Sequence, residues 1–181
     1  MGPPIDTIPT PDLRTPRSTL IAGAVATFLH QWSIPDLDVF WGALDSVPEL
    51  YKTAPAKGCF RIGLEALALL TMALPRDSQK YDIRKSAMRM YGAALKSVNI
   101  ALGDLDQRVT DHTFMAVIFI CIFETLTQVP DAATRAAVHL RGLMTMVDLR
   151  GPGQFSTATG RRLFLVADFL WVSERNSIRT R

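Results

Sequence analysis

The sequence predicts an all-α protein, built as a single domain of about six to seven helices. Apolar residues recur at helical spacing in most segments, and no stretch of useful length alternates between apolar and polar residues as a strand does. Proline or glycine follows most of these segments, where helices usually stop. A chain of 181 residues, 48% of them hydrophobic, is long enough for one compact core.

Both ends of the chain are predicted to lie outside this domain. Residues 1–17 hold five prolines, which favour extended, solvated chain, so we expect a disordered proline-rich tail. Residues 176–181 are polar and basic, which predicts a basic tail. The helical domain is therefore expected over residues 18–175.

The first helix is predicted to begin at Ser18, a good N-cap, and to stop before Ile34–Pro35. A short helix is expected over 36–44, capped by its first residue, Asp36. Val47–Pro48 is then expected to force a turn. The segment 56–74 is apolar on most sides and ends at a proline, so it is expected to lie deep in the core.

A long helix is predicted over 78–102, with Ser78 as its cap and Gly103 as its C-terminal stop. The central helix is expected to begin at a cap formed by Thr110 or Asp111 and to run to about residue 128. Its apolar run is about half the length that a membrane span requires, which favours a buried core helix.

Two helices complete the prediction. Asp131 is expected to cap a helix over 132–150, and Gly151–Pro152 supplies the usual glycine stop with proline just beyond. A last helix is expected over 159–175. No internal repeat at a fixed spacing is visible, which argues against a regular solenoid.

Charge and cysteine content narrow the classes of function. The net charge of +3 is spread along the chain, so it does not by itself imply nucleic-acid binding. Cys59 and Cys121 lie in apolar segments, as expected of buried thiols in a reducing compartment. No phosphate-binding loop or nucleophile motif is present. We expect no enzyme activity, no cofactor and no bound metal.

Glu124 is the most conspicuous polar candidate, because it follows ten apolar residues in the central helix. A carboxylate in that position must be paired, since an isolated buried charge is costly. The predicted partners are Arg141, His139 or Arg150, all on the next helix. A structural clasp between the two helices is favoured over a catalytic acid or a ligand contact.

Other polar residues are given structural roles. His139 has no second metal ligand one helical turn away. Asp111–His112 is read as a cap followed by a solvated histidine, rather than an acid-base pair.

Three glycines are assigned to helix packing. Gly142 sits inside a helix, at a cost that suggests a close helix crossing, and the helix carrying Gly92 is the predicted neighbour. Gly151 is the third, at the predicted stop of its helix.

Several blocks of sequence resemble one known family. His-Leu-Arg-Gly at 139–142 lies within a helix that ends on Leu-Arg-Gly-Pro at 149–152, and Gln-Phe and Gly-Arg-Arg-Leu-Phe follow at 154–155 and 160–164. Together with Met-Tyr-Gly-Ala-Ala-Leu at 90–95, this order resembles the regulatory, or middle homology, domain of fungal zinc-cluster transcription factors. The resemblance covers roughly residues 18–171.

The resemblance implies an all-α regulatory domain in the nucleus or cytoplasm. Its expected partners are another protein or a second copy of the chain, with a small-molecule effector as a further expectation and no membrane. The family's DNA reader needs six closely spaced cysteines, and this chain has two, so we expect no specific DNA binding of its own.

Family members continue with further helices past the Arg-Arg-Leu-Phe block, so this chain resembles a truncated helical array. Two alternatives stay open. One is a helical domain recruited as an enzyme that uses Glu124, His139 and Arg141 in a pocket. The other is an inactive gene fragment.

Overall fold

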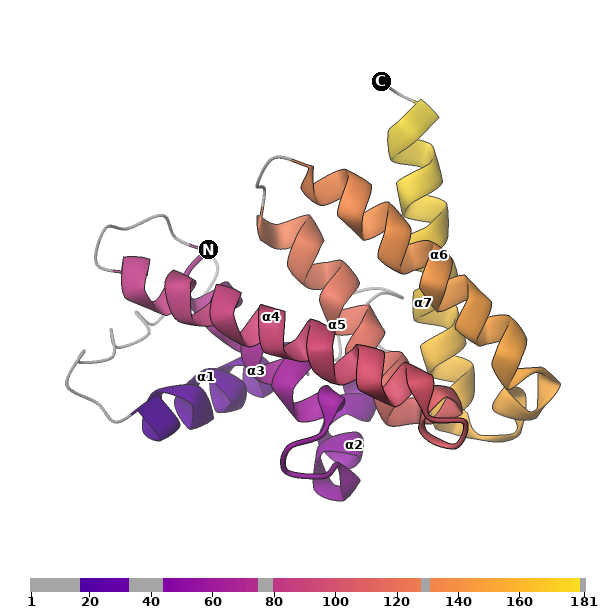
Figure 1. Cartoon of the computed structure of the whole chain (residues 1–181), viewed down its shortest axis with the longest axis horizontal. Coiled ribbons are helices and arrows are strands. Elements are labelled where there is room, and N and C mark those ends of the chain that lie inside the picture. The colour runs from indigo at the N-terminus through magenta and orange to yellow at the C-terminus, as the bar shows by residue number, and fades with distance from the viewer. Residues whose placement is uncertain (1–16, 33–43, 75–79, 128–130, 180–181) are drawn as a thin grey trace, which may run out of the picture.

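The computed structural model describes residues 17–32, 44–74, 80–127 and 131–179. Within these ranges the chain forms seven α-helices, three short 3₁₀ turns and no strand, which confirms the predicted all-α class (Figure 1). The helices are α1 (Arg17–Trp32), α2 (Val47–Thr53), α3 (Cys59–Met72), α4 (Tyr81–Gly103), α5 (Asp111–Thr127), α6 (Ala132–Arg150) and α7 (Ala158–Arg179).

Helices α3 and α5 form the centre of the domain. Helix α3 packs against α1, α4 and α5, while α5 also packs against α4, α6 and α7. Every residue from Thr113 to Glu124 is buried, because neighbours surround α5 on all sides. This explains why both segments are apolar almost all round. The deep position predicted for residues 56–74 is confirmed for α3, whereas both ends of that range are exposed.

The closest helix crossing is not where the sequence suggested. A Cβ atom at Gly142 or Gly92 would meet no atom of a neighbouring segment within 4 Å, and Gly142 is exposed, so the predicted crossing at these two glycines is wrong. The tight contact is at Gly63 of α3, where a Cβ would lie 3.4 Å from the ring of Phe119 and 3.7 Å from the carbonyl oxygen of Ala116. Helices α3 and α5 therefore approach closely at this glycine.

The corner between α6 and α7 contains the residues of the Gly-Pro-x-Gln block. Gly151 has φ +61°, so it ends α6 in a conformation that favours glycine, and its role is conformational rather than one of packing. The Gln154 amide donates hydrogen bonds to the carbonyls of Val147 and Gly151 at 3.0 and 2.9 Å. A Cβ at Gly160 would lie 1.9 Å from the Gln154 carbonyl oxygen, so this position requires glycine.

Some predicted boundaries need correction. Val47–Pro48 forms the first turn of α2 instead of a separate turn, because proline lacks only a donor that the first turn does not use. Gly103 is itself the last residue of α4, one residue beyond the predicted end at 102. Asp131 precedes α6 as predicted, but its side chain makes no capping bond.

Helix α7 continues to Arg179, beyond the predicted boundary at residue 175. Residues 1–16 of the predicted tail 1–17, residues 36–43 of the predicted helix 36–44 and the Ser78 cap lie outside the described residues. Of the remaining positions, Arg17 begins α1 and Leu44 begins the 3₁₀ turn η1 (Leu44–Ser46).

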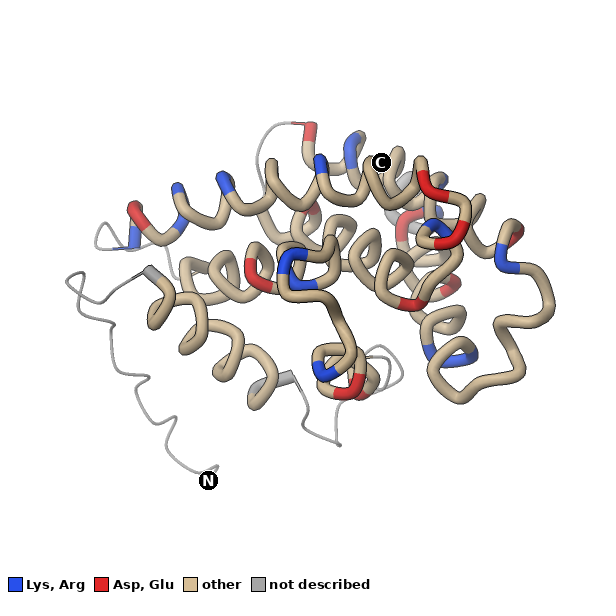
Figure 2. The backbone as a smooth tube through the Cα atoms, turned by 60° about the horizontal axis from the view of Figure 1, so that its bottom comes forward, with Lys and Arg blue, Asp and Glu red and all other residues tan. Residues whose placement is uncertain are grey.

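Several lysines and arginines lie along the outer helix α4 (Figure 2). No helix in the described ranges is long and apolar enough to cross a bilayer.

Candidate functional site

Glu124 is buried at the C-terminal end of α5 and is held by side chains from two other helices. Its side chain is 1% exposed. Arg135 of α6 donates from Nε to Oε1 at 2.8 Å and from Nη2 to Oε2 at 2.9 Å, and the Tyr91 hydroxyl of α4 donates a short hydrogen bond to Oε1. The Tyr91 ring is stacked on Phe123 at 4.4 Å between centroids. The cluster therefore joins α4, α5 and α6.

The predicted pairing of Glu124 with Arg141 is wrong, and the reason is helix geometry. Glu124 lies three residues before the last residue of α5, and Arg135 is the fourth residue of α6, so both are at the α5–α6 corner. Arg141 lies six residues further along α6, about 9 Å along the axis, and its side chain is exposed. In an antiparallel helix pair, the first turn of the second helix lies beside the last turn of the first helix, and the middle of the second helix lies further away.

His139 is at the edge of the same cluster. Its Nε2 lies 3.5 Å from the Tyr91 hydroxyl, so it reaches Glu124 through Tyr91 rather than directly. Burial lowers the pKa of His139, and although the Glu124 charge opposes this, the net direction favours the neutral imidazole. His139 therefore lies near Glu124 as predicted, but Tyr91 lies between them.

The carboxylate of Glu124 is stabilised in its charged form. Burial alone would raise its pKa, but hydrogen bonds from Arg135 and Tyr91 and the Arg135 charge together hold the pKa below the usual value. Burial and the Glu124 hydrogen bond raise the pKa of Tyr91, so the phenol stays protonated. The carboxylate oxygens of Glu124 accept hydrogen bonds from Arg135 and Tyr91, as expected of a polar cluster that holds helices together.

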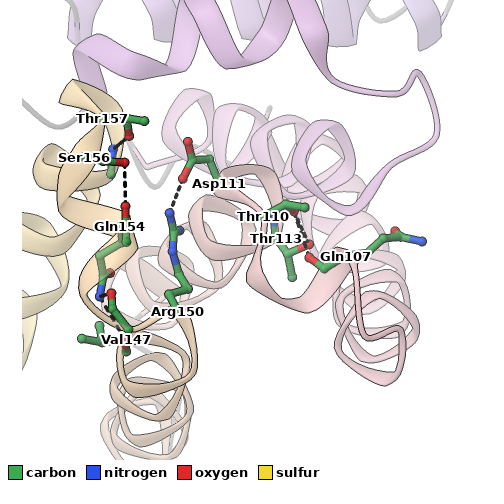
Figure 3. A network of polar contacts seen from close by, with 12 residues as sticks. Gln107, Thr110, Asp111, Thr113, Val147, Arg150, Gln154, Ser156 and Thr157 are labelled. Atoms are coloured by element: carbon green, nitrogen blue, oxygen red, sulfur yellow. Dashed lines mark hydrogen bonds and ion pairs between the residues drawn. The ribbon is translucent and has the colours of Figure 1, made fainter.

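Arg150 belongs to a different site, at the opposite end of α5. Its Nη2 donates to Asp111 at the start of α5 (Figure 3), and its guanidinium carbon lies 4.8 Å from the Phe114 ring centroid. Only 7% of the Arg150 side chain is exposed. The predicted pairing of Arg150 with Glu124 is therefore wrong, because the antiparallel helices place the end of α6 beside the start of α5.

His112 is half-buried and hydrogen-bonded, whereas its place behind a cap suggested a histidine free in solvent. Its Nε2 lies 3.1 Å from both the Leu50 carbonyl oxygen and the Thr53 hydroxyl, and its ring meets the Phe60 ring edge to face at 5.6 Å. The histidine links the start of α5 to the end of α2.

Two cavities open beside the start of α5. The larger has a volume of about 490 Å³ and the smaller about 270 Å³. The larger is lined by Pro55, Lys57, Gly58, Cys59, Phe60, Gln107, Thr110, His112 and Thr113. The smaller is lined by Val109, Asp111, Arg150, Gly153, Gln154 and Thr157. Glu124, His139 and Arg141 line neither of them.

Cys59 and Cys121 are both buried, and neither is in a disulfide. Burial raises the pKa of both thiols, to about 12 for Cys121, so they stay neutral near neutral pH. Among the described residues, no group of three or more histidines, cysteines or carboxylates is placed to hold a metal ion.

Sequence reasoning missed the two residues that complete the Glu124 cluster. Arg135 lies one helical turn before His139, and that spacing was the available signal. Tyr91 could not be found in this way, because only packing of α4 onto α5 brings it to Glu124. Gln154 stood in a recognised block, but its role at the α6 terminus depends on the fold of the corner.

The fold and these sites define a class: an all-α domain in which buried ion pairs fasten the central helix at both ends. The sequence gives the family. The model of the fungal specific transcription factor domain matches residues 26–178, and the chain belongs to this family, which places it in transcription regulation. No curated protein and no solved structure gives a significant match to the chain.

Proposed function

We propose that the chain regulates transcription in the nucleus through protein contact, and that α7 carries the contact surface. Leu165, Phe169 and Val172 of α7 are 52%, 41% and 48% exposed. Their spacing of four and three residues puts them on one face of the helix. We call this face the α7 stripe. Exposed apolar side chains in a continuous row are typical of a surface that another protein covers.

The position of α7 supports this proposal. Its C-terminal turns project past α6 in Figure 1. Exposed residues of both signs lie on α7 beside the stripe: Arg161, Arg162 and Asp168. Mixed charge beside an apolar row suits pairing with an identical surface, since a two-fold axis brings the same patch of each copy together.

The experiment is light scattering of the purified chain after size exclusion. We expect a dimer, and we expect Leu165→Glu to convert it to a monomer that keeps the wild-type helical circular dichroism. The matched control is Ile100→Glu, because Ile100 is 74% exposed on α4 and lies outside the stripe. A monomeric wild type, or equal effects of the two variants, would contradict pairing through α7.

A small-molecule effector is the second candidate for control of this domain. The observation that favours it is the larger cavity at the start of α5, whose volume is within the usual range for ligand pockets.

We further propose that this chain reads no DNA sequence by itself, since its two cysteines cannot form the family's zinc cluster. Binding to random-sequence duplexes at physiological salt, with elemental analysis for zinc, tests this. Selection of one preferred sequence would contradict it.

The enzyme alternative finds no support in the geometry. It required Glu124, His139 and Arg141 in one pocket, whereas Glu124 is fully paired and Arg141 points to solvent from another part of α6.

A further inference from the structure

We propose that residues 44–58, which hold η1, α2 and the connection to α3, form a flap that detaches from the domain as a unit and so opens the larger cavity. Pro55 and Gly58 of the connection line that cavity, together with Cys59 at the start of α3. The inference concerns a movement of the chain itself. It goes beyond the proposed function, because it requires neither contact through α7 nor a bound effector.

Helix α2 is too short to be stable by itself. It has seven residues, whereas isolated helices shorter than about 12–15 residues are marginal in water. Among the described elements, α2 makes no extensive backbone contact with another α-helix, and Figure 1 shows it at the edge of the domain. Its helical form therefore depends on the side chains that dock it, so undocking and local unfolding are expected to occur together.

Two side chains of other helices hold the C-terminal end of α2. Arg61 of α3 donates from Nη2 to the Tyr51 carbonyl at 2.8 Å and from Nε to the Ala54 carbonyl at 3.1 Å. Its guanidinium carbon also lies 3.9 Å from the centre of the Tyr51 ring. The Nε2 atom of His112 in α5 lies 3.1 Å from the Leu50 carbonyl oxygen, and because a carbonyl only accepts, Nε2 is the donor. We call Arg61 and His112 the latch.

The latch pairs with groups that α2 cannot pair by itself. The last carbonyls of a helix have no partner within it, and the helix dipole favours a cation beside them. Both latch residues belong to the two central helices, and His112 also lines the larger cavity. Release of α2 thus removes hydrogen-bond partners of a cavity residue and frees the adjoining wall in one step.

The beginning of the flap carries a buried polar group that favours opening. Ser46 is 3% exposed, and its hydroxyl has no hydrogen-bond partner within the part of the chain that the structure describes. Leaving a buried hydroxyl unpaired is unfavourable, and water pairs with it in the open state. Leu44, Val47 and Leu50 oppose opening, because their side chains are buried while the flap is docked. The closed state is therefore the major one, and the open state is a minor population.

The test is thiol labelling of the full chain, with Cys59 and Cys121 resolved by mass spectrometry. Arg61→Leu should raise the labelling rate of Cys59 by about tenfold, because the loss of two hydrogen bonds makes opening more frequent. The rate at Cys121, inside α5, should not change. Arg84→Leu is the matched control, since Arg84 also donates to a carbonyl at a helix end, that of Thr127, but lies on α4.

A second variant should act in the opposite direction. Ser46→Ala removes the unpaired hydroxyl and no capping bond, so it should slow Cys59 labelling by about threefold. Amide hydrogen exchange of the wild type should show residues 51–54 opening together, and more readily than α3. Equal changes at Cys59 and Cys121 in Arg61→Leu, or an equal effect of Arg84→Leu, would overturn the flap. Unchanged labelling in Ser46→Ala, or exchange of 51–54 as slow as that of α3, would overturn it as well.

Discussion

Arg135 donates a hydrogen bond to each carboxylate oxygen of Glu124, with N–O distances of 2.8 and 2.9 Å. The carboxylate is buried, whereas the Arg135 side chain is 43% exposed, so the guanidinium covers the charge from the solvent side. Paired hydrogen bonds of this geometry are among the stronger polar contacts in proteins. The pair therefore fixes the first turn of α6 against the last turns of α5.

Loss of either partner should destabilise the fold. We expect Glu124→Gln to lower the free energy of unfolding by about 1.5–3 kcal/mol, since it breaks buried hydrogen bonds to a charged group, and we expect Arg135→Met to lower it as well. The double variant should lose less than the sum of the two. Urea unfolding measures this, with Arg141→Met as control because Arg141 is exposed. Strict additivity would show that the two side chains do not interact.

The same pair predicts how stability depends on pH. The pKa of Glu124 is lower in the folded chain than in the unfolded one, so the folded state binds fewer protons. Its stabilisation is complete above the unfolded pKa of about 4.3, and it is lost as pH falls below that value toward the folded pKa. We expect the unfolding free energy of wild type to fall more steeply below about pH 4.3 than that of Glu124→Gln. Parallel curves would contradict the lowered pKa.

Glycine substitutions should separate the positions that need glycine from those that do not. Gly160→Ala places a Cβ against the Gln154 carbonyl and should cost about 1–3 kcal/mol by overpacking. Gly142→Ala meets no neighbouring segment and should gain about 0.5–1 kcal/mol from helix propensity. Thermal unfolding gives both values. If Gly142→Ala were less stable than wild type, a neighbouring helix would have to lie close to Gly142, contrary to the structure.

The ion pair at the other end of α5 should matter as well. The Arg150 side chain is almost completely buried, so Asp111→Asn or Arg150→Met should each cost about 1.5–3 kcal/mol. Hydrogen exchange should rise first at the start of α5 and the end of α6, where the pair joins them. Uniform exchange across the chain in Asp111→Asn would show that the pair does not hold this end in particular.

Most of the helices of this protein, though not α2, follow from local patterns along the chain. The α5 segment is apolar on all sides, and this property specifies a helix enclosed by other helices before any neighbour is known. Gly151–Pro152 likewise ended α6 where predicted, because that stop depends on local backbone conformation. Glu124 was recognised as a buried, paired carboxylate from the ten apolar residues before it.

Which residues contact one another depends on how the helices pack. Arg135, Arg141 and Arg150 are all on the helix after Glu124, and chain order alone does not say which turn comes back to it. Because α5 and α6 pack antiparallel, Glu124 pairs with Arg135 and Asp111 pairs with Arg150. Arg141 is exposed to solvent. Tyr91 and Gly63 depend on crossings of α4 and α3 with α5. Such contacts are set by how helix surfaces fit together in three dimensions, which periodicity along one helix does not record.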